Sequence, residues 1–230
     1  MKIQDYINEQ NESIWKELSQ SYKIELIHEP KEWSWKINTE DPWIKKIITP
    51  TREIEISSFS HELLHLYIDH MGMTTPKEIL HSIYGELSFQ VLTKNGLFSI
   101  LHNFCSHKKM FPFFIEMGFN EKDFISFPAK FGYLTRLTLK SKMIQKQAVG
   151  VTDFIGNTLA LMNNMGSSNE KYNSKKLKKL NAISSSLFSI IEVFDQSWAN
   201  TSDYDIIPSF IIFEQELNEW LINNKIKFSH

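Results

Sequence analysis

The sequence predicts a mainly α-helical protein with a small β-sheet near its N-terminus, an α+β fold. Three observations carry this prediction. Apolar residues recur at helical spacing over most of the 230 residues. Runs in which apolar and polar residues alternate, which are typical of strands, occur only before residue 58, at 22–29, 33–37 and 53–57. The composition, with 42% hydrophobic residues and 13% aromatic residues, is that of a globular chain that buries a large core.

The element that matters most is the helix expected directly after the third strand. A serine at 57, 58 or 60 is expected to cap this helix, which runs to about Met71 before Gly72 ends it. A first helix is expected at 3–20, before the strands. The remaining helices are expected, in order, at 76–94, 97–109, 120–126, 129–147, 150–164, 174–199 and 207–224, with a short element at 111–119 and a loop at 163–174.

Charge and cysteine usage exclude several classes of protein. The formal net charge is −2, whereas a general affinity for nucleic acid normally requires a basic excess, so no nucleic-acid partner is expected. The single cysteine, Cys105, allows no disulfide within the chain, which fits a reducing compartment. The first residues lack the apolar segment of a signal peptide, and no run approaches 18 apolar residues. We therefore expect a cytoplasmic protein without a membrane partner.

The segment His61-Glu62-Leu63-Leu64-His65 carries the clearest chemical signal. On a helix, residues four apart lie on nearly the same face, so His61 and His65 can direct two imidazoles at one metal ion. Neutral imidazole is a good zinc ligand. Glu62 lies about 100° further around the helix, where its carboxylate can reach a water on the metal without binding the metal itself.

This segment, behind an alternating run, resembles the zincin metallopeptidases, in which an edge strand is followed by the metal-binding helix. The resemblance covers about residues 50–120. It implies Zn²⁺ as the cofactor, His61 and His65 as ligands, Glu62 as the catalytic general base, and a peptide or protein as the substrate. We accordingly expect a single domain, 1–230, in which residues 1–120 form a zincin-like α+β part and residues 121–230 an all-helical part.

The third ligand stays open among several residues. Metzincins require Gly and His where this chain has Ile68 and Met71, so that subfamily fits poorly. Gluzincins supply a glutamate from a later helix, and Glu86 is the candidate by distance, although its neighbours do not match that subfamily's signature. The segment at 101–119 offers His102 and His107, which point about 140° apart on a helix and so cannot both serve one ion. We favour His107, at the expected helix end, over His102, and His102 over Glu86.

Two further residues are candidates for positioning the ligands. Asp69 lies one turn beyond His65, whose imidazole it could orient, and Asn103 shares a helix face with His107. The sequence therefore predicts a zinc-dependent hydrolase, specifically a metallopeptidase. The alternative is a non-enzymatic α-helical regulatory or interaction protein, in which the motif is a structural or degenerate metal site.

Overall fold

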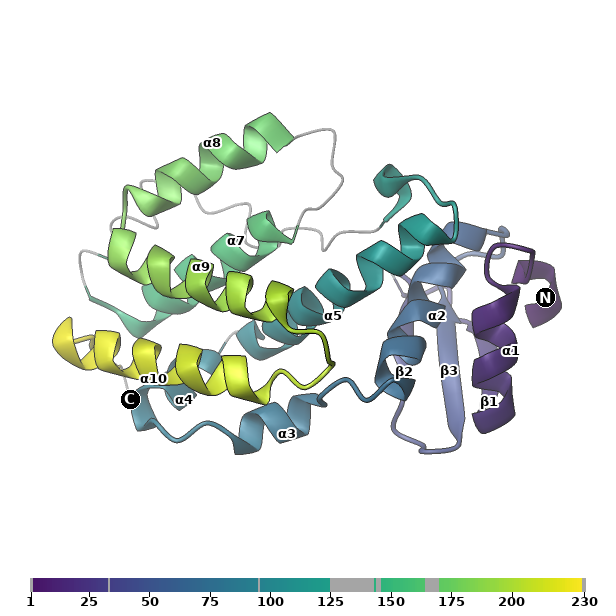
Figure 1. The fold of residues 1–230 in the computed structure, drawn as a ribbon, viewed down its shortest axis with the longest axis horizontal. Helices are drawn as coiled ribbons and strands as arrows, with labels where there is room; N and C mark the ends of the chain where they lie inside the picture. Colours follow the sequence, from purple (N-terminus) through teal and green to yellow (C-terminus); the bar gives the residue numbers. More distant parts are fainter. Residues whose placement is uncertain are drawn as a thin grey trace. The chain divides into compact units, whose positions relative to one another are not determined.

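The computed structural model describes residues 2–32, 34–94, 96–124, 143, 146–163 and 170–228. Helices dominate these ranges, and one three-stranded sheet lies near the N-terminus (Figure 1), so the predicted fold class is confirmed. No helix of the described ranges combines the length and the apolar character that crossing a membrane requires.

The chain divides into two compact units, each built from two stretches of sequence. The first unit comprises Met1–Met73 and Lys109–Ile125, and the second comprises Thr74–Lys108 and Ser126–His230. The second unit thus takes up a segment that the sequence analysis grouped with the motif helix. The expectation of a single domain with an internal boundary near residue 120 stays a prediction.

The first unit is an α+β structure built around the motif helix. Its elements are η1 (Ile3–Tyr6), α1 (Glu12–Ser21), β1 (Lys23–His28), β2 (Lys36–Asn38), β3 (Ile44–Thr49), α2 (Ile56–His70), the last part of α5 (Leu97–Glu116) and η2 (Glu121–Asp123). The strand order is β1-β3-β2, with β1 parallel and β2 antiparallel to β3. Helix α2 packs against β2, β3 and α1, so the sheet and α1 hold the motif helix in place.

The strand predicted at 53–57 is wrong, and the strand before α2 is β3 instead. Threonine side chains explain the difference. The Thr49 hydroxyl donates to the Thr51 carbonyl and accepts from the Thr51 amide, and the Thr51 hydroxyl accepts from the Glu53 amide. These local bonds turn the chain and replace a sheet ladder. Because β3 lies between β1 and β2, the strand that precedes the motif helix is central, not the expected edge strand.

The predicted capping serines are also inside the helix. Helix α2 begins at Ile56, with Glu55 as its N-cap residue. Ser60 is fully buried, and its hydroxyl accepts a hydrogen bond of 2.9 Å from Asn11 Nδ2, which also donates to the Tyr6 carbonyl. The end of the helix agrees with the prediction, since Gly72 follows it at φ +96°, a conformation that favours glycine.

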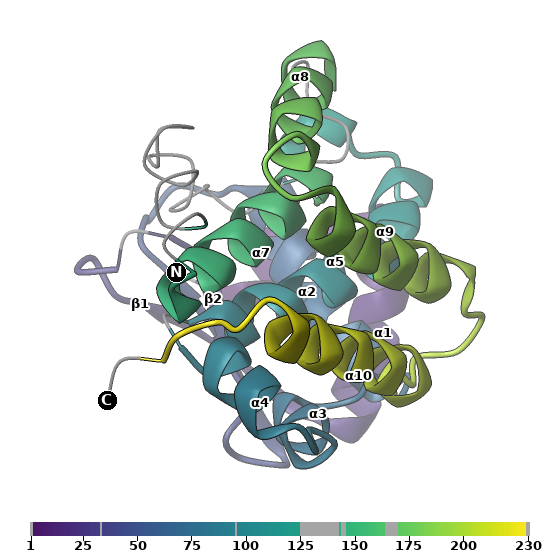
Figure 2. The ribbon, with the colours of Figure 1, turned by 90° about the vertical axis from the view of Figure 1, so that its left-hand side faces the viewer.

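The second unit is helical throughout its described part. Its elements are α3 (Pro76–His81), α4 (Glu86–Leu92), the first part of α5, α7 (Ala148–Met162), α8 (Glu170–Asn181), α9 (Ser185–Asn200) and α10 (Ile207–Asn223). Helix α7 packs against α4, α8 and α9 (Figure 2), and nearly all its residues are buried. A helix that is apolar on every side belongs in the centre of a core. Helix α7 is therefore the centre of this unit.

Three helix predictions differ from the structure in extent. The helix predicted at 76–94 is two helices, because α3 ends at His81 and α4 begins at Glu86, with Gly85 as the N-cap residue of α4. The helix predicted at 97–109 continues to Glu116 through Pro112, so the short element at 111–119 is part of α5. The prediction at 174–199 covers α8 and α9, and α8 begins within the predicted loop.

The other helix predictions vary in outcome. The helix predicted at 3–20 splits into η1 and α1, because Asn8 and Asn11 form a turn between them, with Asn11 Oδ1 accepting from the Asn8 amide. The predictions at 150–164 and 207–224 match α7 and α10 closely. Only η2 is found within the predicted helix at 120–126, and most of the predicted helix at 129–147 lies outside the described residues.

Candidate metal centre

Helix α2 places its polar motif residues in the interior. Five of its apolar side chains are spread around the helix and are fully or almost fully buried; they are Phe59, Leu63, Leu64, Leu66 and Ile68. His61 is 3% exposed and Glu62 is 6% exposed. Burying such groups is costly unless a partner or a function compensates. The motif is therefore not part of an ordinary solvated helix surface.

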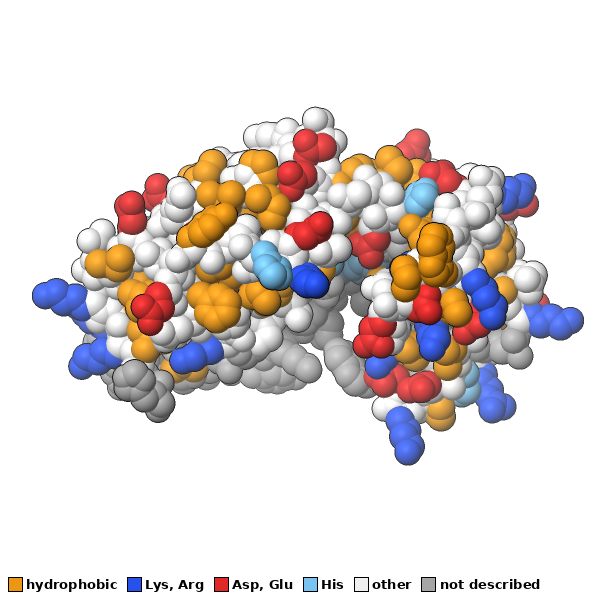
Figure 3. Space-filling view, turned by 90° about the horizontal axis from the view of Figure 1, so that it is seen from below, with side chains coloured by type: hydrophobic (Ala, Val, Ile, Leu, Met, Phe, Trp, Pro, Cys, Tyr) orange, Lys and Arg blue, Asp and Glu red, His pale blue; other side chains and the backbone are white. Residues whose placement is uncertain are grey.

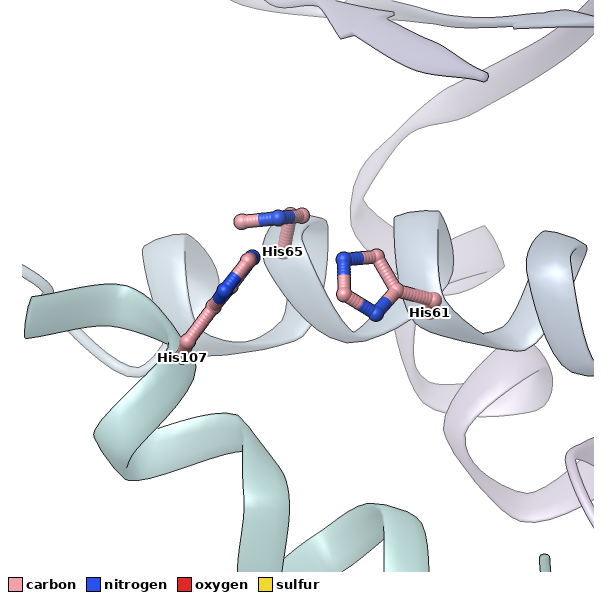
Figure 4. A group of neighbouring side chains, drawn as sticks. All are labelled: His61, His65 and His107. Carbon is pink, nitrogen blue, oxygen red and sulfur yellow. The ribbon is translucent and has the colours of Figure 1, made fainter. Parts of the chain in front are cut away.

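Three histidines converge on one point (Figure 4). His61 and His65 come from successive turns of α2, and His107 comes from α5. Each histidine offers one ring nitrogen, and these three nitrogens lie within 4.8 Å of one another. Nitrogens bound tetrahedrally to one zinc ion lie about 3.4 Å apart, so each pair needs to close by at most about 1.4 Å. Rotation of the imidazoles can supply such a movement.

His107 lies on α5, which is a single helix from Leu97 to Glu116. The residues of α5 from Lys109 onward belong to the first unit, and His107 belongs to the second.

Aromatic rings surround the group on the α2 side. The Phe124 ring lies 4.9 Å from the His61 ring, centroid to centroid, and Phe124 is 3% exposed. Phe124 also packs edge-on against Phe111 and Phe114 of α5, each at 5.2 Å. The rings exclude water from one side of His61 and restrict its orientation.

Burial determines the charge of His61. It lowers the pKa of the imidazole to about 4, because the charged form loses its hydration in the interior. His61 is therefore neutral at pH 7, and the neutral ring is the form that binds a metal ion. The imidazole needs to release no proton when an ion binds.

Burial shifts the pKa of Glu62 in the opposite direction to that of His61. Burial raises the pKa of its carboxyl group to about 8, because the ionised form loses its hydration. Within the described part of the chain, no hydrogen bond or ion pair is formed by the Glu62 carboxylate. A carboxyl group that holds its proton near neutral pH can both accept and donate one during a reaction.

The other candidate ligands do not join the group. His102 lies on α5, and its ring is hydrogen-bonded to the backbone of Thr74, while burial lowers its pKa. Glu86 is exposed at the start of α4. Among the residues that the structure describes, the only group suited to hold a metal is His61, His65 and His107. Their role as ligands stays a prediction.

Among the described residues, the structure shows no hydrogen bond or ion pair between either predicted positioning residue, Asp69 or Asn103, and the three histidines. Asp69 is exposed near the end of α2, and Asn103 is half-buried on α5. A residue that the sequence analysis did not single out contacts His107 instead. Asn163, the residue that follows α7, donates from Nδ2 to His107 Nδ1 at 2.9 Å. The two residues are 56 positions apart, and no local pattern in the sequence links them.

No family model, curated protein or solved structure matches this chain. The resemblance to zincins therefore rests on His61, Glu62 and His65, and the chemistry of the site has to follow from its own residues.

Proposed function

We propose that this chain is a zinc-dependent hydrolase of the metallopeptidase type. His61, His65 and His107 would hold the ion, and Glu62 would act as the general base. The observation that carries the proposal is the grouping of three imidazole nitrogens within 4.8 Å of one another, and the buried residue Glu62 follows His61 directly in the sequence. Three histidines are a known ligand set for catalytic zinc, and they leave a fourth position for water or substrate.

The chain's own residues account for the proton transfers. A zinc ion held by His61, His65 and His107 would act as a Lewis acid towards a water and a carbonyl group. Glu62 would accept the proton of the attacking water as the water oxygen bonds to the carbonyl carbon. Glu62 would then deliver this proton to the leaving nitrogen as the carbon–nitrogen bond breaks. The raised pKa of Glu62 suits both transfers near neutral pH.

The substrate class depends on the resemblance more than on the fold. In zincins an extended peptide can be aligned by an edge strand, but β3, the strand before the motif helix, is paired on both sides. Hydrolysis at a carbonyl carbon is supported by the site, whereas a peptide as substrate is supported by the motif. We include a cytoplasmic location in the proposal, because the only cysteine, Cys105, is buried and no disulfide is possible within the chain.

Metal content tests the site. Protein purified without added zinc should contain about one equivalent of metal by mass spectrometry. His61→Ala and His107→Ala should each lose it. His102→Ala is the matched control for His107, because it removes a histidine from the same helix that lies outside the group. Less than about a tenth of an equivalent in the wild type, unchanged by His61→Ala, would rule out the proposal.

A second variant separates chemistry from binding. Glu62→Gln keeps the size of the side chain but cannot take up a proton, so metal content should stay while hydrolysis of a fluorogenic peptide library falls by about 10²- to 10⁴-fold. Hydrolysis that persists in Glu62→Gln would assign the base to another group.

One observation favours the alternative of a non-enzymatic interaction protein. A groove of about 530 Å³ runs between α9 and α10, and its lining includes Val193 and Ile212, both more than half exposed. Glu216 and Glu219 also line the groove and would favour an amphipathic helix that carries Lys or Arg. Hydrophobic side chains are exposed elsewhere too, among them Trp43 and Tyr84, and hydrophobic side chains gather in patches on the face drawn in Figure 3.

The alternative makes opposite predictions for the two sites. Ile212→Asp should abolish binding of a basic amphipathic peptide, measured by calorimetry, and His61→Ala should change neither peptide binding nor metal content. Under the hydrolase proposal, His61→Ala should instead lose the bound metal.

A further inference from the structure

Asn163 contacts the His107 ring through its side-chain amide. Its Nδ2 lies 2.9 Å from His107 Nδ1, and Asn163 is 2% exposed. Figure 4 shows a His107 nitrogen directed toward His65. Because Asn163 engages Nδ1, the nitrogen available to the histidine group is Nε2.

The direction of this hydrogen bond decides whether His107 can bind a metal. When Asn163 Nδ2 donates to Nδ1, the proton of the neutral ring resides on Nε2. A protonated Nε2 has no lone pair for an ion. Binding through Nε2 requires the other tautomer, in which Nδ1 carries the proton and donates it to an acceptor.

Asn163 already holds that acceptor. Its Oδ1 is buried and has no hydrogen-bond partner among the described residues. Buried acceptors of this kind are uncommon, because each loses its hydration without compensation. Rotation of the amide by 180° exchanges Oδ1 and Nδ2 and leaves the other atoms in place. Oδ1 then accepts from His107 Nδ1–H.

We propose that Asn163 is a positioning residue that selects the Nδ1–H tautomer of His107, so that Nε2 is presented to the metal ion. This inference rests on the proposed zinc site. It adds a specific role for Asn163, the residue that follows α7, which touches neither the ion nor the substrate.

The backbone supports such a role. Asn163 follows the last turn of α7, and its amide donates to the Leu159 carbonyl at 2.8 Å. Helix α7 is buried along almost its whole length, so the amide side chain approaches His107 from a rigid element. A rigid partner fixes both the tautomer and the plane of the imidazole.

Two substitutions at Asn163 separate an acceptor from a donor. Asn163→Leu keeps the approximate shape but offers no hydrogen bond, and zinc affinity should fall about 10- to 100-fold in competition with a chromogenic chelator. Asn163→Asp is acceptor-only, and its affinity should equal or exceed that of the wild type. If Asn163 acts as a donor, the Asp variant should bind as weakly as the Leu variant, and the proposal is then overturned.

A control and a spectroscopic readout exclude a merely structural effect. Asn157→Leu removes another buried amide from α7, one that donates to the Asp153 carbonyl, and it should leave zinc affinity unchanged. Nitrogen-15 spectra of the zinc-loaded wild type should show His107 protonated at Nδ1 and coordinated at Nε2. An equal loss of affinity in Asn157→Leu, or His107 coordinated at Nδ1, would contradict the proposal.

The failure of this inference differs from the failure of the zinc site. Wild-type protein that binds no zinc refutes the proposed function and this inference with it. Wild-type protein that binds zinc while Asn163→Leu binds it equally well refutes the role of Asn163 alone.

Discussion

Glu62→Gln should change how the stability of the metal-free protein depends on pH. Burial raises the pKa of Glu62 from its ordinary value of 4.5 to about 8 in the folded protein. Between these values the folded state retains a proton that the unfolded state has released. The contribution of Glu62 to the free energy of unfolding therefore falls as the pH rises through this window. Glutamine has no such proton, so the variant lacks this contribution.

The size of the effect follows from the shift. Each pKa unit corresponds to about 1.4 kcal/mol, so Glu62 lowers the stability by about 3 kcal/mol at pH 7 and by about 5 kcal/mol once the pH is well above 8. His61 acts in the other direction. Because its pKa falls from 6.5 to about 4, its contribution is complete above pH 6.5 and is lost as the pH falls toward 4. This contribution is common to both proteins and cancels in their difference.

Urea unfolding of chelator-treated protein at several pH values measures that difference. The stability of Glu62→Gln relative to the wild type should rise by about 3 kcal/mol between pH 4.5 and pH 7. Glu86→Gln, which removes an exposed carboxylate from α4, is the control. A difference between Glu62→Gln and wild type that stays constant over this range would refute the reasoning that Glu62 is buried without a compensating partner.

Three further outcomes are expected. Saturating zinc at about 1,000 times its dissociation constant should stabilise the wild type by about 4 kcal/mol, and His61→Ala should abolish this gain in a thermal melt. Phe124→Ala should lower the free energy of unfolding by about 3–5 kcal/mol in urea, because the buried ring packs on His61, Phe111 and Phe114; a loss below about 1 kcal/mol would contradict this packing. Gly85→Ala should lower it by about 1–3 kcal/mol, since an added Cβ would meet Glu214 Oε1 at 2.6 Å, and an unchanged urea midpoint would show that this contact can relax.

Local sequence patterns predicted the helices whose limits depend on their own residues. The motif helix, α7 and α10 lie close to their predicted positions, because their apolar spacing and end signals act within a few turns. Two predictions failed for different reasons, one a packing contact and the other a set of local hydrogen bonds. Helix α5 continues through Pro112, where the aromatic packing of its last turns outweighs the loss of one backbone hydrogen bond. The strand at 53–57 is absent because threonine hydroxyls take up the backbone groups.

The sequence by itself determined that His61 and His65 share one helix face with Glu62 beside them, because helical periodicity fixes the geometry of residues four apart. Only the tertiary structure brought His107 to that face and Asn163 to His107, and only it placed β3 in the centre of the sheet. His65 and His107 are 42 positions apart, and His107 and Asn163 are 56 positions apart, so their proximity depends on how whole helices pack. No spacing rule connects such residues, so the third member of the group and the partner that orients it follow from packing alone.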